Sequence, residues 1–298
     1  MSILEGPRRE LRRVVIAGSA YWAEPVEGGL RLADGRLVDE DTVRYLPPCA
    51  PSKILCVHTN FRSRIYEFSG KSTAPPAPTY FQKPVTALNA HGGELVRPEG
   101  SLYLNYEGEI AAVIGRPTRN VLPEEVWDHL AGFAVSNDVG LQDMRDTDGG
   151  SMLRVKGQDG FCPVGPGLVT GIDITQSIIR SFRNGVLVQE GAVAEMIFGI
   201  DYLVADLARH ITLMPGDIVL TGTPANSRPL DVGDLIEVEV TGLGRLANRV
   251  VAAPPPRAAV GHLPTDSDEV RRVALGNDER LPEAIKAASL ALSKRGSP

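Results

Sequence analysis

The sequence predicts an α+β protein that is mostly β, and three observations lead to this prediction. The chain holds 31 glycines and 23 prolines among 298 residues, more than the roughly 12% combined share of an average protein, which favours many turns. Strand-like apolar segments recur at short intervals between these turn residues. Only two segments of the main body show helical signals, so we expect sheets with few helices.

Composition and charge exclude several classes of protein. The chain is 43% hydrophobic and 23% charged, which is typical of soluble globular proteins and excludes disorder and coiled coils. The net charge is −6 and there is no basic run, so we expect neither nucleic acid nor a membrane as partner. We find no long apolar run and no secretory signal, and expect a cytoplasmic protein. The three cysteines show no C-x-x-C spacing, so neither a disulfide framework nor a zinc knuckle is predicted.

Three regions follow one another along the chain. Residues 1–50 read as a small N-terminal β module, with short alternating strands and a hairpin signal at Asp34-Gly35. A proline cluster separates this module from residues 51–252, the main domain, whose first strand is KILCVHTN. Residues 253–298 begin with a proline-rich linker and continue as a C-terminal tail, for which we expect one short helix at 282–295.

The main domain is predicted from its elements in order. Residues 62–79 are polar, rich in proline and aperiodic, which predicts a long loop and a candidate lid. Helices are expected at 123–130, with proline in the first turn, and at 195–210, where apolar residues recur at helical spacing. The predicted strands are TYFQK, YEGEIAAVIG, GFAVSNDVG, SIIRSF, VLVQE, DIVLTG, LIEVEV and RLANRVV.

The segment YEGEIAAVIG carries the most chemical information. Strand alternation places Glu107 and Glu109 on one face, about 7 Å apart at their Cα atoms. Two converging carboxylates repel each other unless they share a cation or a proton. Taken alone, an E-x-E pattern is more often a pair of solvated residues on an edge strand. Asp138, where the apolar strand of AVSNDVG ends, is able to supply a third carboxylate at the same place.

Three carboxylates favour a magnesium site, since zinc prefers histidine or cysteine ligands. The five histidines show no spacing of metal ligands, so we expect each to be a surface or internally satisfied residue. Lys156 follows an apolar residue and precedes a glycine turn, an unusual place for a lysine that serves only solubility. Thr223 lies in T-G-T-P after an apolar strand, which is either an anion-binding turn or an ordinary one.

Several motifs in one order resemble those of the fumarylacetoacetate hydrolase family. They are F-x-K-P at 81–84, YEGEIAAVIG, SNDVG, VKGQDGFCPVGP, N-G at 184, MPGDIVLTGTP and GDLIEVEVTGLGRLANRV, over about residues 52–252. Within the family, the chain is most similar to the homoprotocatechuate branch of isomerases and decarboxylases (5-oxopent-3-ene-1,2,5-tricarboxylate decarboxylase / 2-hydroxyhepta-2,4-diene-1,7-dioate isomerase). The resemblance implies a mixed β-sandwich roll, a homodimer, bound Mg²⁺ or Mn²⁺, and a 2-oxo acid substrate.

The resemblance also assigns residues. The family's metal ligands fall on Glu107, Glu109 and Asp138. The family lysine falls on Lys156, and the substrate-binding threonine on Thr223.

Two departures from the family pattern affect the predicted chemistry. Hydrolytic members activate water with a histidine and a glutamate, whereas this chain has Arg64 at the histidine position and keeps only Glu67. After Asp138, Gln142 replaces the common family arginine, and Arg145 is our candidate for binding a carboxylate in its place.

These residues lead to one main hypothesis and two alternatives. The main one is a Mg-dependent decarboxylase or isomerase of a 2-oxo (2-hydroxydienoate) dicarboxylic acid that acts through a metal-stabilised enolate. Lys156 would add positive charge or relay a proton, Glu67 would be the general base, and Arg64 would bind the distal carboxylate. The first alternative is a C–C hydrolase of an acylpyruvate or other 1,3-diketo acid, which needs an activated water. The second is a non-catalytic metal-binding module.

Overall fold

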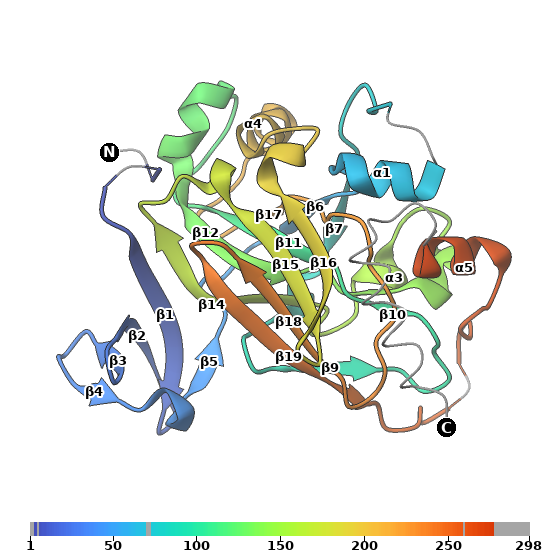
Figure 1. Cartoon of the computed structure of the whole chain (residues 1–298), viewed down its shortest axis with the longest axis horizontal. Helices are drawn as coiled ribbons and strands as arrows, with labels where there is room; N and C mark the ends of the chain where they lie inside the picture. The colour runs from blue at the N-terminus through green and yellow to red at the C-terminus, as the bar shows by residue number, and fades with distance from the viewer. Residues whose placement is uncertain (1–2, 5, 70–72, 259, 277–298) are drawn as a thin grey trace.

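Two facing β-sheets form the body of the protein (Figure 1). The computed structural model describes residues 3–4, 6–69, 73–258 and 260–276. Within these residues, the first sheet has the order β4-β3-β2-β1-β14-β12-β11-β17-β6-β7, with β5 on β1 and β8 on β14. Its strands are β1 (Arg9–Ile16), β2 (Ser19–Val26), β3 (Gly29–Leu32), β4 (Leu37–Val38), β5 (Arg44–Leu46), β6 (Ile54–Val57), β7 (Tyr80–Lys83), β8 (Leu88–Asn89), β11 (Gly108–Ile114), β12 (Leu130–Asn137), β14 (Cys162–Thr170) and β17 (Ile218–Leu220).

The second sheet has the order β16-β15-β18-β19-β9, and β10 pairs separately with β13. Parallel pairs, such as β17 with β6 and β19 with β9, occur beside antiparallel ones, so the sheets are mixed. The α+β, mostly β prediction, with a β-sandwich roll, is confirmed. These strands are β9 (Glu94–Arg97), β10 (Leu104–Asn105), β13 (Gly140–Leu141), β15 (Ile178–Arg183), β16 (Val186–Ala192), β18 (Leu235–Val240) and β19 (Gly244–Ala252).

Helices lie at the edges and ends of the sheets (Figure 1). The α-helices are α1 (Arg62–Ser69), α2 (Arg145–Asp148), α3 (Leu153–Lys156), α4 (Ile200–His210) and α5 (Asp268–Leu275). The 3-10 helices are η1 (Glu40–Thr42), η2 (Val85–Ala87), η3 (Pro123–His129), η4 (Gln142–Met144), η5 (Ile174–Gln176) and η6 (Val193–Glu195). No helix in the described part of the chain is both long and apolar enough to cross a membrane.

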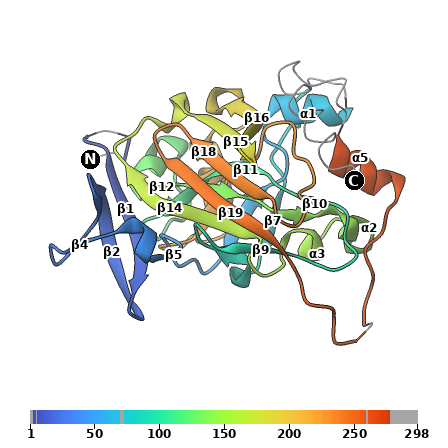
Figure 2. The same cartoon turned by 60° about the horizontal axis from the view of Figure 1, so that its bottom comes forward.

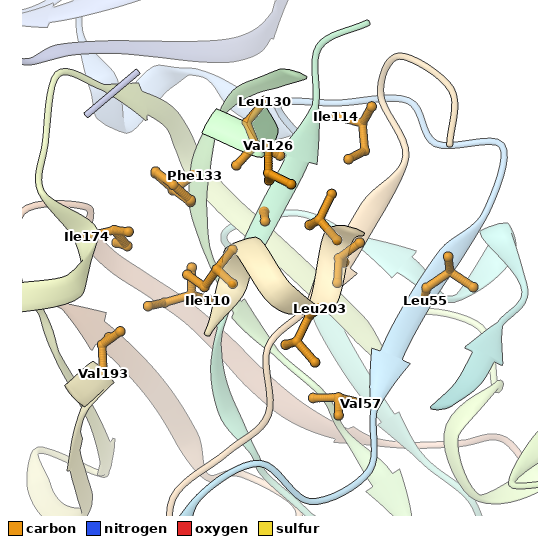
Figure 3. Packing of buried hydrophobic residues seen from close by; sticks show 14 of the residues in the cluster. Leu55, Val57, Ile110, Ile114, Val126, Leu130, Phe133, Ile174, Val193 and Leu203 are labelled. Atoms are coloured by element: carbon orange, nitrogen blue, oxygen red, sulfur yellow. The ribbon is translucent and has the colours of Figure 1, made fainter. Parts of the chain in front are cut away.

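The main core joins the two sheets and α4, as Figure 3 shows. Leu55 of β6, Ile110 of β11 and Phe133 of β12 belong to one buried cluster with Leu203 of α4. The helical spacing of the apolar residues in α4 is confirmed, because this face packs on the sheet. The helix itself begins at Ile200, five residues later than expected, and the segment expected as a helix at 123–130 is the 3-10 helix η3.

The N-terminal strands form the predicted small β module and have a core of their own. The Asp34-Gly35 turn joins β3 to β4, with Leu30 paired to Val38. The module is nevertheless continuous with the main sheet, because β1 pairs antiparallel with β14. The division of the chain into domains stays a prediction.

The prediction of a loop at 62–79 is wrong for the first half of this segment, which forms the helix α1. The helix buries Arg64 and Glu67 as an ion pair, so its inner face is polar and shows no apolar period. The expected tail helix at 282–295 lies outside the described residues. A different helix, α5, lies in the part of the tail that follows the proline-rich linker, and Ser267 caps its N-terminus.

Candidate active site

Three buried carboxylates meet at one end of the central strands. Glu107 directly precedes β11 and Asp138 directly follows β12, and these strands are paired in a register that aligns Gly108 with Asn137. The carboxylates of Glu107, Glu109 and Asp138 each offer an oxygen within 4.8 Å of the others. Their exposed fractions are 9%, 1% and 1%. The solvated edge-strand interpretation is therefore wrong, since β11 lies between β12 and β17 inside the sheet.

The three acids repel one another. Burial raises the pKa of Glu109 well above its usual value, and the charges of Asp138 and Glu107 raise it further. The backbone N–H of Gly222 donates to Glu109 Oε2 at 2.7 Å, which compensates only in part. An all-oxygen donor set with this excess of negative charge fits a hard divalent cation.

Lys156 neutralises part of this charge. Its ammonium lies 2.6 Å from Glu107 Oε2 and 3.0 Å from Asp138 Oδ2, and it also donates to the Asp138 carbonyl at 2.8 Å. Burial alone would lower the pKa of Lys156, but Asp138 and Glu107 outweigh it and the pKa is raised. The side chain is therefore a protonated cation within the acidic cluster.

Lys83 is a second buried cation, and sequence reasoning gave it no role. Its ammonium pairs with Asp138 Oδ1 and donates to the Phe161 carbonyl at 2.6 Å. Burial opposes ionisation of Asp138, but Lys156 and Lys83 outweigh burial and lower its pKa. The signal was present as the lysine of the F-x-K-P motif, which β7 directs inward together with Phe81. Three carboxylates and two lysines leave an excess of one negative charge when all are ionised.

Glu67 lies beside the cluster but is held by arginines. Arg64 donates to Glu67 Oε2 at 2.6 Å, and Arg228, a residue that sequence reasoning missed, lies 2.7 Å from Oε1. Burial would raise the pKa of Glu67, but the two arginines outweigh it and the pKa is lowered. Arg64 also lies 3.5 Å from Glu107 Oε1, so α1 is tied to the acidic cluster.

A cavity of about 220 Å³ opens onto the cluster. Glu107 and Lys156 line the cavity. Glu109 and Asp138 do not line it but belong to the same cluster as Glu107. Glu67 is paired with Arg64, which does line it. The four residues predicted to bind substrate all lie in its wall: Arg64, Gln142, Arg145 and Thr223. The fold thus brings the predicted site residues together.

Two of these wall residues differ in what they offer a ligand. Gln142 is 1% exposed, and among the described residues its side-chain Oε1 has no hydrogen-bond partner. An unpartnered buried acceptor beside a cavity is suited to a ligand hydroxyl or N–H. The Thr223 hydroxyl instead donates to the Gly108 carbonyl at 2.9 Å and accepts from Gln189 Nε2 at 2.8 Å. The hydroxyl hydrogen of Thr223 is therefore already donated within the protein, unlike the unpartnered acceptor of Gln142.

His58 also lies in the cavity wall, although sequence reasoning gave it no role in the site. Its ring is tilted against Phe81 with centroids 4.8 Å apart. Burial lowers its pKa, and the positive charges of Lys156 and Arg145 lower it further, which favours the neutral imidazole. No spacing in the sequence marks His58 as a site residue, because it is the only histidine in the cavity wall given by the described residues.

Comparisons with known proteins agree with this arrangement. The family model described as Fumarylacetoacetate (FAA) hydrolase C-terminal matches residues 53–251. Protein Rv2993c of Mycobacterium tuberculosis is 38% identical over 213 residues, which cover 70% of this chain and 79% of that protein. The homoprotocatechuate catabolism bifunctional isomerase/decarboxylase of Escherichia coli is 39% identical over 181 residues, covering 60% of this chain but 42% of its own length. The chain thus spans less than half of that enzyme.

A solved structure is also similar. The crystal structure of 5-carboxymethyl-2-hydroxymuconate delta-isomerase from Mycobacterium smegmatis superposes with a TM-score of 0.75 at 32% sequence identity. The match covers 82% of this chain and 99% of the isomerase chain, so this chain carries additional residues.

Proposed function

Because the chain belongs to the fumarylacetoacetate hydrolase family, we propose that it is a divalent-metal-dependent decarboxylase or isomerase of a 2-oxo (2-hydroxydienoate) dicarboxylic acid in aromatic-compound catabolism. The observation that carries this proposal is the buried acidic cluster beside a cavity lined by cationic side chains. The similar isomerase has a substrate whose name denotes a 2-hydroxy acid with several carboxylates, which supports a dicarboxylic substrate.

Glu107, Glu109 and Asp138 would hold the metal ion, for which Mg²⁺ or Mn²⁺ is proposed because every donor is a carboxylate oxygen. When bound, such an ion would act as a Lewis acid toward the 2-oxo and carboxylate oxygens of the substrate.

The protein's own groups then stabilise charge and move protons. Lys156 keeps a protonated ammonium at the cavity wall, where it would stabilise negative charge on the enolate and deliver a proton to it. Gln142 would accept a hydrogen bond from the substrate's 2-hydroxyl.

Arg64 and Glu67 act as a pair in this proposal. Arg64 lies 3.5 Å from a carboxylate of the proposed metal site, so we assign to it the part of the substrate near the metal rather than the distal carboxylate expected from the sequence. When Arg64 turns to a substrate anion, its hold on Glu67 weakens and the pKa of Glu67 rises. Glu67 would then be the general base for tautomerisation.

The test is incubation of the full chain with a 2-hydroxydienoate dicarboxylic acid and Mg²⁺ or Mn²⁺, following dienoate absorbance and CO₂ release. We expect loss of absorbance, with CO₂ for a decarboxylase or without it for an isomerase. A chelator should stop the reaction and added metal should restore it. If the substrate stays unchanged with both metals, the proposed reaction is rejected. If a chelator has no effect on the reaction, its dependence on a metal ion is rejected.

A hydrolase is the second candidate because His58 lies in the cavity wall with a lowered pKa, and a neutral imidazole there would activate water. Acylpyruvate should then yield pyruvate and a carboxylic acid, and His58→Gln should abolish this product. Chelator-sensitive turnover of any substrate would exclude the non-catalytic module.

A further inference from the structure

The helix α5 covers one side of the cavity, although it lies beyond the family match that ends at residue 251. Figures 1 and 2 both show α5 beside α1 at the same end of the molecule. Arg272 and Val273 of α5 line the cavity that also contains Glu107 and Lys156. The segment after the family match therefore contributes directly to the wall of the candidate active site.

This helix is firmly anchored. Val270 and Ala274 are fully buried, and the buried Asn105 side chain donates to the Ala274 carbonyl at 2.8 Å. Before the helix, Thr265 N–H donates to the Asp143 carbonyl at 3.0 Å. After it, Gly276 has a positive φ of 63° and lies against Glu67, leaving no room for a Cβ. Such contacts fix the position of α5 relative to the cavity.

Two arginines line the cavity and share one carboxylate, that of Glu269. Glu269 accepts from Nε and Nη2 of Arg272, at 2.9 and 2.8 Å, and lies 3.7 Å from Arg145 Nε. In the described part of the chain, the only other polar contact of the Arg145 side chain is with the sulfur of Met152 at 3.9 Å. Arg145 thus retains donors for an external anion, and Arg272 presents a second guanidinium beside it.

We propose that Arg272, together with Arg145, binds the second carboxylate of the substrate and so selects dicarboxylic over monocarboxylic 2-oxo acids. The first carboxylate would lie at the acidic cluster, and the two guanidinium groups, which line the same cavity, would receive the second. Guanidinium groups match carboxylates in a bidentate geometry, which suits them to this role. Glu269 would hold both arginines in place. This inference rests on the proposed function for the identity of the substrate.

The test uses Arg272→Ala with Arg271→Ala as a matched control. Arg271 is the next residue of the same helix, and it pairs with Asp266 outside the cavity. With saturating Mg²⁺, kcat/KM is measured for a 2-oxo dicarboxylate and for a monocarboxylate of equal chain length. Arg272→Ala should lower the dicarboxylate value about 10- to 100-fold, mainly through KM, and leave the monocarboxylate value unchanged. Arg272→Lys should restore part of the loss. If the ratio of kcat/KM for the dicarboxylate to kcat/KM for the monocarboxylate is the same in Arg272→Ala as in wild type, the proposal is overturned.

A binding measurement separates this proposal from the proposed reaction. Glutarate is titrated calorimetrically into full-length wild type and into full-length Arg272→Ala with Mg²⁺ present. If no 2-oxo acid is turned over, the proposed reaction fails, and the arginine site still stands when glutarate binds wild type about 10-fold more tightly than it binds Arg272→Ala. Equal binding of glutarate to both, or none to either, would overturn the arginine site.

Discussion

Buried carboxylates lie near both ends of β17, and their surroundings are opposite. Asp217, directly before the strand, accepts from Ser52 N–H at 2.8 Å, from the Ser52 hydroxyl at 2.7 Å and from Met214 N–H at 2.7 Å, and it pairs with Lys53. Glu109 receives the Gly222 N–H, just after the strand, and otherwise faces the carboxylates of the acidic cluster.

The two environments shift pKa values in opposite directions. Burial opposes ionisation of Asp217, but its internal donors outweigh burial and lower its pKa. For Glu109, burial and its neighbours act together and raise the pKa. A carboxylate with internal donors stabilises the fold, whereas one packed against like charges costs stability unless a cation is bound. Such a cost is typical of functional sites, so the contrast separates a structural acid from a candidate metal ligand.

The largest expected effect comes from Glu109→Gln, which keeps the shape of the side chain but removes its charge. Without this ligand the metal site should fail, and turnover of the proposed substrate should fall about 1,000-fold or more. Denaturant unfolding of the metal-free variant should show a stability equal to or higher than that of wild type, because a repulsive charge is gone. Full activity in this variant would show that Glu109 is not a metal ligand.

A second expected effect comes from Lys83→Met. Among the described residues, only lysines pair with the Asp138 carboxylate, so the substitution leaves a buried charge with one partner fewer. We expect the free energy of unfolding to fall by about 3 kcal/mol. Denaturant titration measures it, and a loss below about 1 kcal/mol would show that Lys83 contributes little to charge balance.

Asp217→Asn should lower stability by about 2 kcal/mol, because several charge-assisted hydrogen bonds are weakened at once. Activity per folded molecule should be unchanged, in contrast to Glu109→Gln. If this variant folds normally but is inactive, Asp217 is not a purely structural acid and the contrast with Glu109 is wrong.

This stabilisation should depend on pH in one direction. Since the pKa of Asp217 is lowered from its ordinary 3.8, the carboxylate contributes fully above that value, and the contribution is lost as pH falls through the folded-state pKa. The stability difference between wild type and Asp217→Asn should therefore shrink below about pH 4. Unfolding titrations at several acidic pH values measure it, and a difference that grows instead would contradict the assignment.

The smallest effect is expected for Lys53→Met, at about 1 kcal/mol. Lys53 is partly exposed and its partner Asp217 keeps several other donors, whereas Asp138 depends on its lysines. Unfolding measurements on Lys53→Met and Lys83→Met in parallel test this ranking. Equal losses would show that the two carboxylates rely on their lysines alike.

Much of the fold was predictable because strands and turns are local patterns. The strand predicted at the E-x-E segment and the helical spacing in α4 both appear in the structure. Helix α1 was missed because its buried face carries Arg64 and Glu67, which break the apolar period. Helix α5 was missed although its signals were present, namely the Ser267 cap, apolar residues at helical spacing and a following glycine.

The site was predictable where motifs carried it and not where folding assembled it. Glu107, Glu109 and Asp138 came from two motifs and meet in one cluster. Lys83 and His58 reach the same place from β7 and from the segment after β6, and no sequence spacing joins them to the acids. The roles of the site residues, the homodimer and the cytoplasmic location stay predictions.

The central claim is that three acids bind one hard divalent ion, and calorimetric titration of Mg²⁺ into the metal-free protein tests it most directly. Wild type and Asp217→Asn should each bind one ion per chain at the acidic cluster, and Glu109→Gln should bind none there. If wild type takes up no Mg²⁺, or if Glu109→Gln takes it up as wild type does, the claim is contradicted.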